Sequence, residues 1–141
     1  MIEDKPVIID TNILFSALVR GQSGLGDVLL RSERKLYVCE YVIIELFKHK
    51  DRLVKASHLS EEDILAWLYL LLKRLNIFKE DLISPENRVA AYKLCVDVDE
   101  NDTPHVALAL ELNGLLWTGD KKLKRGLQDK GFDQFFESTT R

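Results

Sequence analysis

Short apolar runs alternate with longer amphipathic stretches along the chain. Val7–Ile9, residues 36–38 and residues 115–118 are continuous apolar runs, which favours strands buried on both faces, as in a parallel sheet. Residues 77–83 predict a further strand, and residues 132–137 predict a last edge strand. The pattern therefore predicts a sheet of short, mostly buried strands.

The stretches between these runs have helical spacing and recognisable helix ends. Ser60 and Ser84 are placed to cap helices, proline follows at position 85, and Asn113-Gly114 suits a helix end. Residues 21–26 hold three glycines and predict a flexible turn. We expect helices over residues 13–19, 41–53, 60–75, 84–95, 103–112 and 122–129, and a short helix capped by Asp27.

Strands alternating with helices indicate an α/β fold, a three-layer α/β/α sandwich with a mainly parallel central sheet. A chain of 141 residues favours one domain spanning residues 1–141. The sequence contains no internal repeat, low-complexity segment or linker. We therefore expect the candidate chemistry to belong to a single core.

Bulk composition narrows the functional classes only slightly. A net charge of -3 argues against general electrostatic adhesion to nucleic acid, although carboxylates gathered in a metal site would themselves lower the charge. Cys39 and Cys95 lie in apolar runs without zinc-type spacing, so we expect buried free thiols. The N-terminus lacks a signal-peptide pattern, and the apolar stretch 64–72 is too short to span a bilayer. These features predict a cytoplasmic protein with no membrane partner.

Two acidic residues follow predicted strands. Asp10 comes directly after Val7–Ile9, and Asp120 follows the run that ends near Thr118. In parallel α/β sheets ligands bind beyond the carboxyl ends of the strands, so both carboxylates are expected in one crevice if these strands are neighbours. The alternative is that each acid only caps the helix that follows it.

Further acids stand in less usual surroundings. Glu45 is embedded in an apolar stretch, where a buried carboxylate is costly unless paired or bound to metal, but spacing alone favours a place on the polar stripe of an amphipathic helix. A dense acidic cluster precedes the helix predicted from residue 103; it is either a solvated, helix-capping loop or a cation site. It lacks the glycine and terminal glutamate of an EF-hand. The cluster comprises Asp97, Asp99, Glu100 and Asp102.

Carboxylates without histidine or cysteine partners suit a hard cation such as Mg²⁺ or Mn²⁺. His49, His58 and His105 show no ligand spacing and are expected to be incidental. The chain also lacks a Walker loop, a dinucleotide-binding glycine pattern and a nucleophile elbow.

The order of these motifs resembles that of PIN-domain nucleases. Residues 8–12 (Ile-Ile-Asp-Thr-Asn) resemble the opening motif, and Ile44-Glu45-Leu46 resembles the second acid. Residues 102–109 resemble the third acid followed by an alanine-rich helix, and Thr118-Gly119-Asp120 resembles the fourth acidic motif. Each motif is weak alone, but four in order over nearly the whole chain are fairly specific.

The resemblance implies a divalent-metal-dependent endoribonuclease, in which water attacks an RNA phosphodiester and leaves 5′-phosphate and 3′-hydroxyl ends. It assigns catalysis and binding of one or two Mg²⁺ or Mn²⁺ ions to four acids, with Asp99 as an additional or alternative third ligand. Asn12 and Thr118 are then candidates to orient carboxylates or water, and Lys48, Lys121 and Lys122 to contact RNA phosphates. For the lysines, a solvated helix face is the competing interpretation. The four acids are Asp10, Glu45, Asp102 and Asp120.

Many prokaryotic members of this family are toxins of toxin–antitoxin pairs, of the VapC sort, so the resemblance also implies a possible antitoxin partner and a homodimer. The helix expected over residues 60–75 looks like the family's variable clip-like insertion, for which core packing competes with a role in partner contacts.

Two other functions compete with the nuclease. The first is a Mg²⁺-dependent phosphohydrolase of the haloacid-dehalogenase type, but that chemistry requires a second aspartate where this chain has Asn12. The second is a PIN-like RNA-binding module without catalysis.

Overall fold

Four short parallel strands form the sheet in the computed structural model, which describes residues 4–21 and 24–137. They are β1 (Val7–Ile9), β2 (Leu36–Cys39), β3 (Asn76–Phe78) and β4 (Leu115–Trp117), in the order β3-β2-β1-β4. In the register, Ile9 lies opposite Trp117 and Val7 opposite Leu36. Because β1 and β4 are parallel neighbours, the residues that follow them emerge at the same edge of the sheet.

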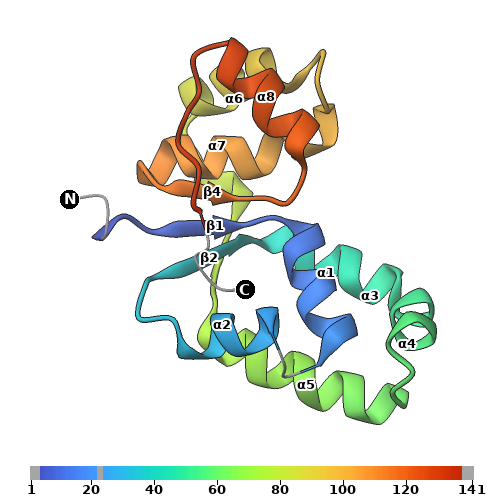
Figure 1. Cartoon of the computed structure of the whole chain (residues 1–141). Helices are drawn as coiled ribbons and strands as arrows, with labels where there is room; N and C mark the ends of the chain where they lie inside the picture. The colour runs from blue at the N-terminus through green and yellow to red at the C-terminus, as the bar shows by residue number, and fades with distance from the viewer. Residues whose placement is uncertain (1–3, 22–23, 138–141) are drawn as a thin grey trace.

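Helices cover both faces of this sheet, which makes the fold a three-layer α/β/α sandwich (Figure 1). One side holds α1, α2 and α5, with α3 and α4 extending beyond them, and α6, α7 and α8 lie on the other side. The bounds are α1 (Thr11–Arg20), α2 (Leu25–Arg31), α3 (Glu40–Lys48), α4 (Lys50–Ser57), α5 (Glu61–Arg74), α6 (Pro85–Cys95), α7 (Thr103–Leu112) and α8 (Lys121–Asp129). Two 3₁₀ turns, η2 (Glu80–Leu82) and η3 (Glu100–Asp102), complete the described elements.

The core lies between the sheet and its helices. All residues of β1 and β4 are buried, as the continuous apolar runs predicted. On one side α7 contributes a buried stretch of small and branched residues, 106–109, and on the other Trp67 of α5 donates its indole N–H to the Ala17 carbonyl at 3.0 Å. Cys39 and Cys95 are buried free thiols, as expected, and burial raises the thiol pKa values to about 12 and about 11.

The predicted helix over residues 41–53 is wrong, because the chain turns at His49 and forms α3 and α4 separately. This turn allows Leu53 to be buried next to α1. It also removes Arg52 from the helix of Glu45: its guanidinium lies 5.0 Å from the centre of the Phe15 ring. Lys50, the first residue of α4, forms an ion pair with Glu61 of α5 at 2.7 Å.

Asp27 is not the cap of its helix. Gly24, with φ of 60°, precedes α2, and Asp27 lies in the first turn, where its carboxylate accepts a hydrogen bond from Arg31 at 2.7 Å. Of the turn expected over residues 21–26, positions 22 and 23 lie outside the described residues, and Gly26 already belongs to α2. A left-handed glycine at position 24 therefore starts the helix three residues earlier than the acid suggested.

Two predicted strands are shorter than expected. The strand over residues 77–83 ends at Phe78, because Glu80–Leu82 form the turn η2. The edge strand over residues 132–137 is reduced to one parallel bridge, between Leu116 and Phe135. The bridge still places the last described segment beside β4, where Phe136 contacts the Trp117 ring at 4.8 Å between centroids.

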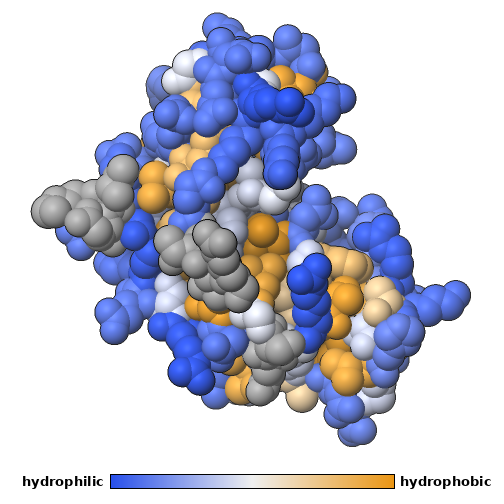
Figure 2. Space-filling view, viewed as in Figure 1, coloured by the Kyte–Doolittle hydropathy of each residue, from blue (hydrophilic) through white to orange (hydrophobic). Residues whose placement is uncertain are grey.

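Apolar side chains also reach the surface. Figure 2 shows hydrophobic residues gathered on the half of the molecule that contains α1 and α5, whereas the visible surface around α6 and α8 is mostly hydrophilic. One face of α5 is buried, but Leu65, Tyr69 and Leu70 remain exposed. Among the described residues no single helix is long and apolar enough to cross a membrane; α1 and α2 meet that condition only together, as a pair bent by 109°.

Candidate functional site

A pocket of about 700 Å³ opens beyond the carboxyl ends of β1 and β4. Its lining is dominated by acidic side chains and, among the described residues, includes no lysine or arginine. The acids come from four separate parts of the chain. They are Asp10, Glu45, Asp99, Glu100, Asp102 and Asp120.

Asp10 joins β1 to α1 and is almost entirely buried, with 3% of its surface exposed. Its Oδ1 accepts a hydrogen bond from the Ile13 N–H at 2.9 Å, so it caps α1. Burial raises the pKa of Asp10, and the nearby charge of Asp120 adds to that effect, while hydrogen bonds from Thr118 and backbone N–H groups oppose it. The cap thus fixes the orientation of the Asp10 carboxylate in the lining of the acidic pocket.

Asp120 is held in the same way at the end of the neighbouring strand. It caps α8, with Oδ1 accepting from the Leu123 N–H at 3.0 Å. Thr118 connects the two strand-end acids, because its hydroxyl accepts the Asp120 N–H at 3.1 Å and hydrogen bonds with the Asp10 side chain. The sequence left helix capping and a shared crevice as alternatives. In the structure Asp10 and Asp120 each cap a helix and also line the same pocket.

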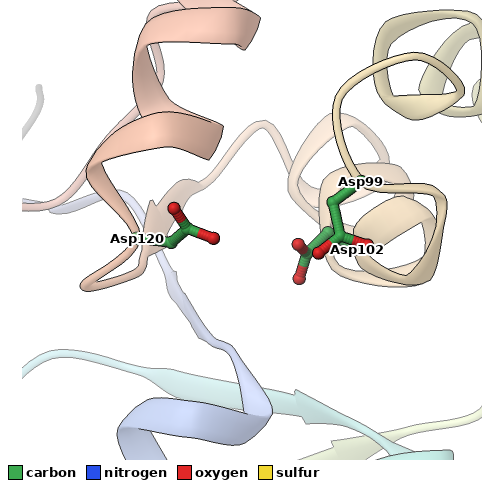
Figure 3. Close-up of side chains that lie close together, drawn as sticks. All are labelled: Asp99, Asp102 and Asp120. Carbon is green, nitrogen blue, oxygen red and sulfur yellow. The ribbon is translucent and has the colours of Figure 1, made fainter.

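The tightest cluster joins Asp120 to the segment between α6 and α7. Asp99, Asp102 and Asp120 offer carboxylate oxygens that all lie within 4.8 Å of one another. Figure 3 shows the Asp120 side chain directed across a gap toward the two other carboxylates. Asp99 caps η3 by accepting the Asn101 N–H at 3.0 Å, whereas Asp102 makes no side-chain cap bond. Asp99 and Asp102 therefore both belong to the cluster.

The charge balance of this cluster favours a cation. Burial, together with repulsion from the carboxylates of Asp99, Asp10 and Asp120, raises the pKa of Asp102 to about 7. Near neutral pH this group keeps its proton for part of the time unless a positive charge joins the cluster. The donors are all carboxylate oxygens, which fit a hard divalent cation such as Mg²⁺ or Mn²⁺.

Glu45 lines the same pocket from α3 without belonging to the tightest cluster. Its side chain is 36% exposed, and its Oε2 lies 3.4 Å from Nε2 of His49. Glu45 therefore lines the pocket from α3, a separate element from those that carry the clustered acids.

A polar network beside the acids was missed in the sequence. His105 is 1% exposed, and its Nε2 lies 2.8 Å from the Tyr41 hydroxyl and 3.5 Å from the Thr11 hydroxyl. Burial lowers the pKa of His105 to about 4, so the ring is neutral at physiological pH. The available signal was spacing: Tyr41 stands one helical turn before Glu45, and His105 nearly one turn after Asp102.

The comparison that decides the family covers most of the chain. A family model described as PIN domain matches residues 8–138. The chain belongs to the PIN-domain family. This assignment excludes the haloacid-dehalogenase alternative and confirms the family expected from the order of the four acidic motifs.

Solved structures agree with the fold of this PIN domain. VapBC2 from Rickettsia felis, in a crystal structure with a DNA fragment from their promoter, matches with a TM-score of 0.63 and 20% identity, over 85% of this chain and 92% of that chain. The crystal structure of PAE2754 from Pyrobaculum aerophilum matches with a TM-score of 0.61 and 13% identity, over 88% and 80%. At these identities the likeness concerns the fold alone. No protein in the curated set matches the sequence.

The remaining predicted site residues surround the pocket of the PIN domain. Asn12 is exposed and lines it. Lys121 and Lys122 are exposed in the first turn of α8, directly after Asp120, and Lys48 is exposed in the last turn of α3. All three lysines lie outside the pocket lining, so any contact they make to a substrate is around the acids rather than among them.

Proposed function

We propose that this PIN domain is a divalent-metal-dependent endoribonuclease formed by residues 1–141. The observation that carries the proposal is the convergence of Asp99, Asp102 and Asp120 within 4.8 Å of one another, in a pocket that Asp10 and Glu45 also line. Carboxylates at such distances repel each other, and a bound cation removes that cost.

The acids would hold one or two Mg²⁺ or Mn²⁺ ions, with Asp10, Glu45, Asp102 and Asp120 as the principal ligands and Asp99 beside them. When bound, the ion lowers the pKa of a coordinated water and stabilises charge on the phosphate. Each strand-end aspartate uses Oδ1 as a helix cap, so its orientation is fixed before any ligand arrives. Thr118 and Asn12 would orient the carboxylates or the attacking water.

Substrate contacts outside the pocket would come from the exposed side chains of Lys48, Lys121 and Lys122. RNA is the proposed substrate, cleaved to 5′-phosphate and 3′-hydroxyl ends. The cytoplasm remains the expected compartment.

We further propose that the chain is the toxin of a toxin–antitoxin pair and forms a homodimer. The fold match to VapBC2 and the exposed apolar side chains of α3 and α5 support a protein partner. Co-purification of the product of an adjacent small gene, and the mass of the purified chain in solution, test these two points separately. The exposed side chains are Ile44, Phe47, Leu65, Tyr69 and Leu70.

The nuclease proposal is tested by cleavage of end-labelled single-stranded RNA with Mg²⁺ or Mn²⁺ and with EDTA. We expect metal-dependent cleavage that falls at least about 100-fold in Asp102→Asn and in Asp120→Asn. The matched control is Asp129→Asn, which removes an exposed acid at the other end of α8 and should retain activity.

Equal activity of Asp102→Asn and wild type would contradict the proposal. RNA binding without cleavage under every metal condition would favour the non-catalytic binding module instead.

A further inference from the structure

An exposed aromatic ring stands in the lining of the acidic pocket. Tyr92, on α6, is 47% exposed and lines the pocket together with the acids. Its neighbours along the helix hold it firmly, because Ala91 and Cys95 are buried and Ser84 caps α6 by accepting the Asn87 N–H at 3.3 Å. The ring is therefore presented to the pocket from a rigid support.

The pocket needs binding contacts that do not depend on positive side chains. Its lining contains six carboxylates and, within residues 4–21 and 24–137, no lysine or arginine. A phosphate entering it meets no positively charged side chain of this lining, and the rest of a nucleotide must be held by uncharged contacts. Stacking of a base on an aromatic ring is such a contact and acts on every base.

Tyr92 is the lining aromatic suited to that contact. The hydroxyl of Tyr41 is 2.8 Å from Nε2 of His105, and that ring packs against the histidine with centroids 5.5 Å apart. His105 itself is buried. Tyr92, by contrast, leaves nearly half of its surface open at the pocket.

We propose that Tyr92 is the stacking platform for one unpaired nucleobase next to the phosphate held at the acids, so that the site selects single-stranded over duplex RNA. The inference rests on the proposed nuclease function. Bases within a duplex are already stacked on their neighbours, and only an unpaired base can place its face on this ring without first being pulled from a helix.

The first test is steady-state cleavage of a labelled single-stranded RNA by the full chain with Mn²⁺. Tyr92→Ala should raise KM about 10-fold with kcat nearly unchanged, and Tyr92→Phe, which keeps the ring, should recover most of that loss. Val89→Ala is the matched control, because Val89 is an exposed apolar residue on the same helix, α6, and does not line the pocket. On a fully duplex RNA the same Tyr92→Ala change should alter cleavage less than twofold.

A second test locates the stacked base. A set of RNAs with one abasic position each is compared on wild type and Tyr92→Ala, and at one position near the cleaved bond the two changes should not be additive. If wild type cleaves and Tyr92→Ala matches Val89→Ala on every RNA, the stacking role is overturned while the nuclease proposal stands. If wild type fails to cleave any RNA, the nuclease proposal fails first. In that case Tyr92→Ala must still weaken binding of the single strand in Mn²⁺, or the stacking role falls too.

Discussion

At the scale of single residues, the most informative group is Asp102. Its carboxyl is half-buried and faces three other carboxylates, which together with burial hold its pKa near 7. In the folded protein it therefore binds a proton at pH values where the unfolded chain, with an ordinary pKa of 3.8, has released it. The folded state consequently loses stability as pH rises through this window, in the absence of metal.

Asp102→Asn removes this dependence. In EDTA, the Tm of the variant minus the Tm of wild type should grow by about 3–6 °C between pH 4 and pH 8, after allowance for solvent screening of a partly exposed group. Calorimetry or circular dichroism at several pH values measures the difference. A difference that stays constant over that range would contradict the shifted pKa.

Asp120 has two separable tasks, since it caps α8 and belongs to the acidic cluster. Asp120→Asn retains a capping oxygen but weakens metal binding, whereas Asp120→Ala loses both. We expect cleavage to be abolished in both variants, with Ala about 1 kcal/mol less stable than Asn in urea unfolding. Equal stabilities would mean that the cap contributes nothing at this helix.

At the scale of elements, α2 is held against α5 by a close approach at Gly26. A Cβ at this position would stand 2.5 Å from a ring carbon of Trp67 and 2.5 Å from the Gly21 carbonyl oxygen. The indole is fixed by its hydrogen bond to Ala17, so it cannot withdraw freely. Glycine is therefore required at position 26 because it has no side chain, not because of its backbone freedom.

Gly26→Ala should therefore destabilise the protein by about 1–3 kcal/mol, even though alanine by itself favours a helix by up to about 1 kcal/mol. Urea unfolding measures the change. Gly119→Ala is the control, because a Cβ there meets nothing within 4 Å. A stabilised Gly26→Ala would show that the two helices can separate at little cost.

The elements also show where sequence reasoning succeeds. Residues 7–9 and 115–117 were predicted because continuous apolar runs need burial on both faces, and Ser60 and Ser84 cap their helices as expected. The turn at His49 was missed because apolar spacing continues through it, and only the core position of Leu53 requires the chain to bend. Local sequence patterns therefore predict where helices and strands lie, but they do not show where a helix is interrupted.

The candidate site divides along the same line. Asp10 and Asp120 were placed together by the rule that parallel strands end at one edge, and the order of family motifs supplied Glu45 and Asp102. The contact between Tyr41 and His105 joins residues 64 positions apart; helical spacing places each of them near an acid, but it does not show that the two side chains meet. The sequence likewise could not decide between Asp99 and Asp102 as the third acid. In the structure both carboxylates belong to the acidic cluster.

At the scale of the whole molecule, the proposed metal site would couple ion binding to folding. Four segments of the chain must be in place before the carboxylates converge, so a bound ion would stabilise the folded state. We expect Mg²⁺ or Mn²⁺ at millimolar concentration to raise the Tm of wild type by several degrees, and Asp10→Asn to blunt the rise. Thermal unfolding with and without EDTA measures this, with Ca²⁺ as a comparison ion; an unchanged Tm would argue against a metal site.

Within the part of the chain that the structure describes, no lysine or arginine lines the pocket, which implies an order of events for the proposed nuclease. An acidic pocket without bound cations repels a polyanion such as RNA. Divalent cations must therefore bind first, because they reverse the charge of the pocket. Chelation of the divalent ions should therefore weaken RNA binding as well as RNA cleavage. A higher RNA concentration should not restore the activity of the metal-free protein. For the proposed nuclease, the concentration of free divalent cations would then determine when RNA can bind.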